Sequence, residues 1–193
     1  MKLLSSLGSF LLDILETVVI SLAIFVVFYV FIAQPHQVKG DSMLPDFHTG
    51  EYILTNKLSF KFSNPKRGDV IVFKYPNAPQ YDYIKRIVGL PKEEIELING
   101  VVTVYNEENP SGFKLDEPYL SKGTVTMGRS FLSENLRYKI PENEYFVMGD
   151  NRDKSSDSRQ WGPLPKDNII GRSWVRYWPP QALAVIDTPR YNN

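Results

Sequence analysis

An uncharged apolar run near the start of the chain constrains the fold more than any other feature of the sequence. It reads TVVISLAIFVVFYVFIA over 17–33, and extension to Ile14 and Gln34 lengthens it further. Crossing roughly 30 Å of hydrocarbon takes about 20 apolar residues in a helix, which this stretch supplies. An unbroken apolar surface is unusual for the core helix of a small domain. The run therefore predicts a single membrane-spanning helix.

A cleaved signal peptide is the main alternative interpretation of this run. Such a peptide begins with basic residues, has a shorter apolar part and ends with small residues before the cut. Here Lys2 is the only basic residue before the run, Asp13 and Glu16 adjoin it, and bulky Phe31 occupies a position that needs a small residue. We interpret the run as a retained anchor. The positive-inside rule does not decide its orientation, because Lys2 and Lys39 flank it almost equally.

After the anchor, the sequence changes to short β-type runs separated by Gly, Pro and Asn. The clearest is Glu94–Val104, where an Asn-Gly pair supplies the positive φ angles of a tight turn between two alternating strands. Residues from about 106 to 137 are polar and have little periodicity, so we expect an inserted lobe or long loops there. The predicted fold is mainly β. A tail and anchor (1–35) precede an antiparallel-sheet domain (36–193) that carries the small lobe.

Composition excludes several classes of function. The 22 basic residues balance 22 acidic residues, which argues against a nucleic-acid partner. The chain contains no Cys, so it has no disulfide, no thiol nucleophile and no thiolate metal site. With only two His, a zinc site would need carboxylates in unusual roles. We therefore expect neither a metal nor a cofactor.

The stretch GDSMLP, residues 40–45, places the hydroxyl of Ser42 shortly after the anchor. Nine residues separate Ala33 from Ser42, which span at most about 30 Å. Ser42 is therefore expected to lie near the membrane surface. A serine that attacks a carbonyl needs a group to accept its proton. His36 and His48 lie nearby in sequence, but both are in settings typical of exposed loop histidines, so neither is expected to be that base.

A neutral lysine is the alternative base, because burial among apolar groups lowers the pKa of an amine. Alternate residues of a strand share a face, so within Tyr81–Val88 the side chain of Lys85 lies on the same face as Tyr83. Arg86 lies on the opposite face with Asp82, an available counter-ion. This arrangement leaves Lys85 without a charged partner. A strand lysine that extends into solvent is the competing interpretation.

A dense polar loop, GDNRDKSSDSRQWG at 149–162, directly follows an apolar strand. Loops on rigid scaffolds often carry function. A solvated turn with local Asp–Arg pairs fits the same pattern.

Four blocks, in this order along the chain, resemble the type I signal peptidases, membrane-bound serine proteases that remove signal peptides from exported proteins. They are GDSMLP at 40–45, RGDVIVF at 67–73, YIKRIVGLP at 83–91 and GDNRDKSSDSRQWG at 149–162. The resemblance extends from the anchor to Trp178. Gly40 stands where some members have a serine. The sequence resembles the short, single-anchor branch found in Gram-positive bacteria, in which glycine at this position is a familiar variant. Asp46 replaces a threonine that is common in the family.

The resemblance implies a role for each matching residue. Ser42 would be the nucleophile and Lys85 the general base, with Ser155 holding the lysine ammonium in place. Asp157 and Arg159 would form a charge pair that stiffens the last loop. The backbone N–H of Ser42 would hold the oxyanion.

The resemblance also implies substrate, partners and location. The family prefers small side chains at the first and third positions before the cut, so we expect shallow apolar pockets, with Met43, Tyr83 and Ile84 as candidate lining residues. The expected partners are signal-peptide-bearing preproteins and the lipid bilayer, without nucleic acid. The protein is expected in the cell membrane as a single-pass chain, with its catalytic domain on the extracytoplasmic side.

Two alternatives stay open. The first is a non-catalytic assembly factor or pilus chaperone with the same fold, although Ser42 and Lys85 are both present. The second is a self-cleaving Ser/Lys protein related to transcriptional repressors. That protein would need a DNA-binding or partner-binding N-terminal domain, and this chain has an anchor there instead.

Overall fold

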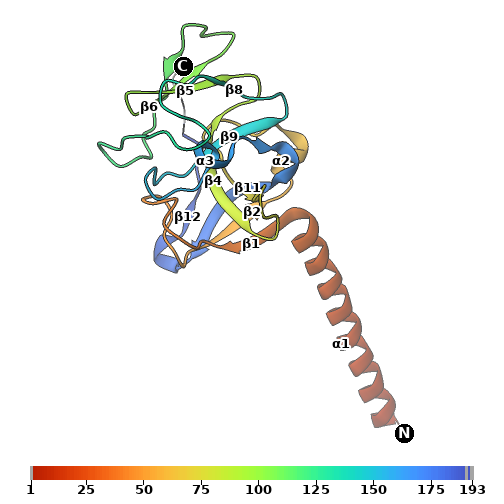
Figure 1. Ribbon diagram of the computed structural model, residues 1–193. Helices are drawn as coiled ribbons and strands as arrows, with labels where there is room; N and C mark the ends of the chain where they lie inside the picture. The colour runs from red at the N-terminus through yellow and green to blue at the C-terminus, as the bar shows by residue number, and fades with distance from the viewer. Residues whose placement is uncertain (1, 190, 192–193) are drawn as a thin grey trace.

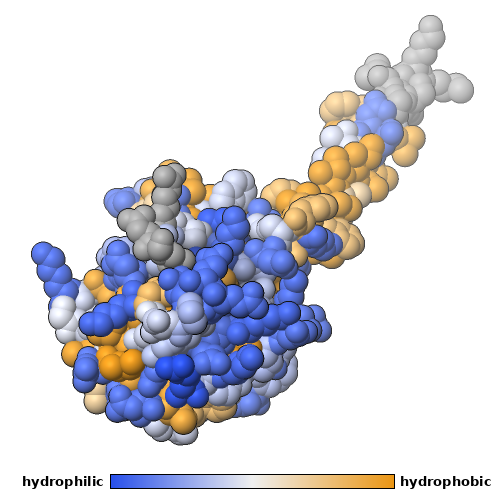
Figure 2. All heavy atoms as spheres, turned by 90° about the horizontal axis from the view of Figure 1, so that it is seen from above, coloured by the Kyte–Doolittle hydropathy of each residue, from blue (hydrophilic) through white to orange (hydrophobic). Residues whose placement is uncertain are grey.

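The computed structural model, which describes residues 2–189 and 191, consists of a long N-terminal helix and a β-rich body (Figure 1). Helix α1 (Lys2–Val27) continues as the π-helical turn η1 (Phe28–Ile32). Within them, Phe10–Ile32 forms a 23-residue apolar stretch that is long enough to cross a membrane and has no buried residues. Figure 2 shows it as a mainly apolar stalk beside a mainly polar body. The predicted helix is confirmed.

The helix ends earlier than the sequence suggested. We extended the apolar run to Gln34, whereas the helix stops at Ile32 and strand β1 (Ala33–Gln37) begins at once. Pro35 explains the difference, because proline lacks an N–H and pushes the preceding residue towards extended backbone. The helix therefore enters the sheet without a linker, and residue 35, the last residue of the expected N-terminal segment, lies within β1.

The body is built on an eight-stranded antiparallel sheet in the order β1-β2-β11-β3-β4-β9-β10, with β12 paired to β11. Strands far apart in sequence are thus neighbours: β11 lies between β2 and β3, and β9 lies beside β4. The remaining strands of this sheet are β2 (Tyr52–Asn56), β3 (Val70–Lys74), β4 (Asp82–Gly89), β9 (Glu144–Met148), β10 (Leu164–Pro165), β11 (Ile169–Trp178) and β12 (Ala184–Val185).

A second, four-stranded sheet has the order β7-β6-β5-β8. Its centre is the predicted hairpin, in which Ile98 pairs with Val101 across a turn with positive φ at Asn99 and Gly100. The segment 106–137 was expected to form an inserted lobe. It contributes strand β7 and long loops to this second sheet, but the sheet starts earlier in the chain, with strand β5. The strands are β5 (Glu94–Ile98), β6 (Val101–Tyr105), β7 (Phe113–Lys114) and β8 (Tyr138–Lys139).

Short helical segments connect the strands: α2 (Ser59–Phe62), α3 (Ser158–Trp161), η2 (Lys166–Asn168) and η3 (Pro180–Ala182). The predicted fold class, mainly antiparallel β with one apolar N-terminal helix, is confirmed. One of the hydrophobic clusters lies beneath the turn that carries Ser42 and so positions it. Its buried members are Val38, Met43, Phe47, Ile53, Val70 and Val72.

Candidate active site

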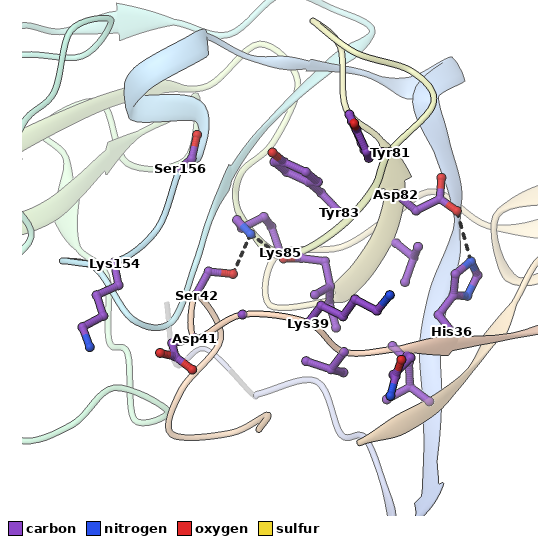
Figure 3. A pocket seen from close by; sticks show the side chains of 16 residues that line it. His36, Lys39, Asp41, Ser42, Tyr81, Asp82, Tyr83, Lys85, Lys154 and Ser156 are labelled. Atoms are coloured by element: carbon purple, nitrogen blue, oxygen red, sulfur yellow. Dashed lines mark hydrogen bonds and ion pairs between the residues drawn. The ribbon is translucent and has the colours of Figure 1, made fainter. Parts of the chain in front are cut away.

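Ser42 lies in a tight turn between β1 and β2. Gly40 has φ of +87°, a left-handed conformation that glycine adopts without steric cost, and it directs the chain into the turn. The N–H of Phe47 donates to the carbonyl of Met43 (2.9 Å), and both of these side chains are buried in the cluster below. Burial of these two apolar residues holds the turn down and leaves Ser42 facing the cleft above (Figure 3).

Lys85 reaches the same point from the middle of β4, where it pairs with Ile71 of β3. Its Nζ lies 2.8 Å from Ser42 Oγ and also donates to the carbonyl of Ile84 at 2.8 Å (Figure 3). The structure therefore brings together the two residues that were predicted to act as a pair. A separation of about 3 Å allows direct proton transfer between them.

The surroundings of Lys85 favour its neutral form. Its exposed fraction is only 4%, and burial lowers the pKa of its amine from 10.5 to about 8, against the opposing effect of the carboxylates of Asp157 and Asp150. Among the described residues, no carboxylate forms an ion pair with this amine. The ring of Tyr83, on the same strand face, lies 5.3 Å from Nζ. Burial thus makes a larger fraction of this amine neutral than in an exposed lysine, and the neutral amine is suited to act as a base.

A cleft of about 440 Å³ surrounds the pair. Tyr83 and Ile84 line it, as expected. Met43 does not: it is 1% exposed and packs in the cluster under the serine turn, because consecutive residues of the turn point in different directions. Within residues 2–189 and 191, no group of three or more His, Asp or Glu side chains is arranged to hold a metal ion.

Sequence reasoning missed the apolar floor of the cleft, Val38, Ile53 and Val72. Ile53 and Val72 come from the separate strands β2 and β3, and Val38 directly follows β1. Strands β2 and β3 are separated by β11, so only the order of strands in the sheet brings the three side chains together, and no local pattern in the sequence marks them as neighbours. Polar residues missed in the lining include Lys39, Lys154 and Ser156.

His36 differs from the expectation of an exposed loop residue. It lies on β1, is half-buried, and places Nδ1 3.0 Å from Thr55 Oγ1 and Nε2 3.5 Å from Asp82. Burial lowers its pKa, and Asp82 opposes this effect. The prediction failed because β1 begins immediately after the anchor and includes this residue. His48 is exposed in a loop, as expected.

Arg86 is not paired with Asp82 as the strand pattern suggested. Its guanidinium is 2% exposed and binds both carboxylate oxygens of Asp150, at 2.9 and 2.7 Å. It also donates to Asp46 at 2.8 Å. The reason is the sheet order, since β9 lies beside β4 and the loop that follows β9 carries Asp150. The guanidinium of Arg86 thus connects β4, which carries Lys85, to the turn that carries Ser42 and to the loop after β9. Asp46 therefore has a structural role that the sequence did not reveal.

The polar loop at 149–162, called the last loop here, is held by the predicted charge pair of Asp157 and Arg159. Two guanidinium nitrogens of Arg159 bind the two carboxylate oxygens of Asp157 at 2.9 and 2.8 Å, and both side chains are fully buried. Burial raises the pKa of Asp157, but the hydrogen bonds and charge of Arg159 outweigh this and hold it below the usual value. Asp157 also caps α3 by accepting from the N–H of Arg159. The ion pair and the helix cap restrict the motion of this loop, and the charge of Asp157 in it acts on the Lys85 amine.

Ser155 lies in this loop but does not make the expected contact. Its Oγ accepts from the N–H of Gly149 at 3.1 Å, and the same N–H also lies 3.1 Å from a carboxylate oxygen of Asp157. In the part of the chain described, the hydrogen bonds of the Lys85 amine go to Ser42 and Ile84 instead. Ser155 is therefore a partner of the loop backbone in this structure rather than of the ammonium.

The backbone of Ser42 is hydrogen-bonded through its carbonyl but not through its N–H to any residue that the structure describes. Its carbonyl accepts from the N–H of Asn151 at 3.0 Å, while its own N–H donates no hydrogen bond to any described residue. An N–H that is fixed in direction and has no protein acceptor is suited to bind an oxyanion.

Comparison with known proteins gives consistent matches. The model of the family "signal peptidase, peptidase S26" matches residues 11–178. A probable signal peptidase I-1 from Synechocystis is 32% identical over 177 residues, which cover 88% of this chain and 84% of that protein. A signal peptidase IB from Staphylococcus aureus is 32% identical over 181 residues, which cover 86% of this chain and 91% of that protein. The crystal structure of a signal peptidase I from Enterococcus faecalis matches with a TM-score of 0.44 and 26% identity, over 57% of this chain and 97% of that one.

Proposed function

Because this chain belongs to the signal peptidase family, a family of serine peptidases, we propose that Ser42 and Lys85 are its catalytic pair. The proposed reaction is the removal of N-terminal signal peptides from exported preproteins by a membrane-bound endopeptidase. The single observation that supports this most is the 2.8 Å separation of Lys85 Nζ from Ser42 Oγ in a cleft that buries the amine.

In the proposed mechanism, the neutral amine of Lys85 accepts the proton of Ser42 as Oγ attacks the scissile carbonyl. The backbone N–H of Ser42 stabilises the negative charge on the carbonyl oxygen. The ammonium then returns the proton to the leaving amine, and the C–N bond breaks to leave an ester on Ser42. Water, deprotonated by the same lysine, hydrolyses the ester and releases the signal peptide.

The substrate is proposed to bind as an extended strand. Strand β4 pairs with β3 along Asp82–Arg86 but pairs with β9 only from Arg86 onwards. On the side of β9, residues 82–84 therefore have no strand partner, and this edge lies beside the cleft. An added strand obtains main-chain hydrogen bonds at such an edge, and pockets for alternate side chains give specificity. The apolar floor of Val38, Ile53 and Val72 suits small apolar side chains of this strand.

The membrane anchor is proposed to hold this cleft at the bilayer surface. The apolar stretch Phe10–Ile32 matches the length needed to cross a bilayer. It continues directly into β1, which places Ser42 within a short stretch of chain from the lipid. The β-rich body then lies on the extracytoplasmic side of the cell membrane, where signal peptides of exported preproteins are accessible.

The experiment compares the purified full chain with Ser42→Ala and Lys85→Ala on a preprotein substrate. The wild type is expected to release the mature protein, and both variants are expected to lose this activity while their thermal unfolding stays close to that of the wild type. Equal processing by all three forms would remove these residues from the mechanism. Failure of the folded wild type to cleave any preprotein would point to a non-catalytic assembly factor instead.

A further inference from the structure

A second cavity, of about 310 Å³, lies where the anchor meets the β-rich body. Val30 and Phe31, from the last turn of η1, form part of its wall, and Phe60 of α2 and Ile169 of β11 add further apolar surface. It shares no lining residue with the catalytic cleft. The cavity therefore has to be explained independently of the proposed reaction.

Three lysines line this cavity: Lys57 after β2, Lys61 on α2 and Lys166 in η2. Asp167, which is exposed, is the only acid in the lining. Among the residues that the structure describes, none of the three lysines forms an ion pair. Since the whole chain has no net charge, this excess of positive charge is local.

The contacts of these amines are with neutral groups. Lys61 Nζ lies 5.9 Å from the ring centroid of Phe31, and Lys166 Nζ donates to the side-chain oxygen of Asn64 at 2.9 Å. Lys57 Nζ lies 3.5 Å from the side-chain oxygen of Gln34, a long and weak contact. All three charges thus remain available to an anionic ligand.

The position of the cavity along the anchor identifies the ligand chemistry. The apolar stretch ends at Ile32, so Val30 and Phe31 lie at the depth where hydrocarbon gives way to lipid headgroups. Phe62, on the same short helix as Lys61, is 86% exposed. Exposed aromatic residues beside lysines are typical of surfaces that enter the interface of a bilayer.

We propose that this cavity binds the phosphate headgroup of an anionic phospholipid such as phosphatidylglycerol. The headgroup lies among the three lysines, and its acyl chains run along Val30 and Phe31 into the bilayer. This inference rests on the membrane anchoring proposed above but not on the peptidase activity. Its consequence is that one bound lipid ties α2 and β11 to the bilayer surface and so sets the orientation of the catalytic body.

The test uses the full chain in detergent micelles and measures lipid retained per chain by native mass spectrometry, during titration with phosphatidylglycerol or phosphatidylcholine of identical acyl chains. The site variant combines Lys57→Gln, Lys61→Gln and Lys166→Gln. Each lysine near an anionic lipid contributes roughly a fivefold factor, so we expect the variant to bind phosphatidylglycerol on the order of 100-fold more weakly. The corresponding triple replacement by Arg is expected to retain binding.

A matched control changes three other lysines that are exposed and lie on β7, on β8 and in the loops between them, Lys114→Gln, Lys139→Gln and Lys122→Gln. This control removes the same charge and is expected to bind phosphatidylglycerol like the wild type. Equal affinity of the wild type for both lipids, or equal weakening by the site and control variants, would overturn the proposal. Displacement of the lipid by millimolar glycerol phosphate would show instead a site for a soluble anion.

Carbonate extraction of reconstituted vesicles separates failure of this proposal from failure of the anchoring on which it depends. A chain that is released by carbonate lacks the proposed anchor, and the lipid site falls with it. A chain that stays in the vesicles without preferring the anionic lipid keeps its anchor but loses the lipid site. Either result leaves the assignment of the catalytic pair unaffected.

Discussion

Raising the pH from 6 to 9 is expected to increase kcat/KM for a signal-peptide substrate by about 90-fold, because Lys85 loses its proton in this range. Burial lowers the pKa of its amine from 10.5 to about 8. With that pKa, the neutral fraction is about 1% at pH 6, about 10% at pH 7 and about 90% at pH 9. An amine that kept the ordinary value would be neutral in only about 0.03% of molecules at pH 7, so burial increases the available base about 300-fold, or by about 3 kcal/mol.

The assay follows cleavage of an internally quenched peptide that spans a signal-peptide cleavage site, with the full chain in detergent micelles. The pH dependence of kcat/KM reports the ionisation of the free enzyme. We expect log kcat/KM to rise with a slope of one up to about pH 8 and to level off above it. Thermal unfolding at each pH checks that the fold persists. Lys85→Ala is the matched control and should give a low rate without this limb.

Two outcomes would refute this reasoning. A rate that continues to climb with a slope of one through pH 10 would mean that the amine titrates as an exposed lysine. A limb below pH 6.5 would instead point to His36 as the base, because that histidine borders the same cleft and burial lowers its pKa from 6.5.

Three further substitutions test the supporting structure. Arg86→Gln should lower the free energy of unfolding by about 3–5 kcal/mol, because it leaves the buried carboxylate of Asp150 without its guanidinium; urea unfolding measures this, and an unchanged midpoint would contradict it. Ser155→Ala should lower kcat more than it raises KM in the peptide assay. The reason is that Ser155 bonds to the backbone of the loop near Lys85 and does not line the cleft. A change confined to KM would argue against that role. Met43→Ala should cost about 2–5 kcal/mol of stability as a core truncation, whereas an effect on KM alone would return Met43 to the substrate pocket.

Local patterns in the sequence were sufficient for the features that depend on short segments. The uncharged run predicted the helix, and the Asn-Gly pair predicted the turn at Asn99 and Gly100. Alternation along one strand separated Lys85 from the face of Arg86, and the structure places them in different surroundings, one beside Ser42 and the other beside Asp150. These features need no knowledge of which strands are neighbours.

Features that depend on sheet order could not be predicted in this way. Asp82 was assigned to Arg86 because they share a strand face, but β9 lies beside β4 and its following loop supplies Asp150 as the partner. The floor of the cleft likewise combines residues from β2 and β3 with Val38. Such contacts join positions that are distant in sequence, and an isolated sequence contains no periodicity that encodes them.

Strand β1 begins at the residue after η1 ends, so no linker separates the helix from the sheet. A body on a flexible tether would sample many heights and tilts above the lipid, and its cutting point would vary with them. In the proposed membrane-anchored form, the absence of a linker restricts the range of distances that Ser42 can take from the bilayer. We therefore expect the proposed peptidase to select bonds by their distance from the hydrocarbon as well as by the side chains around them.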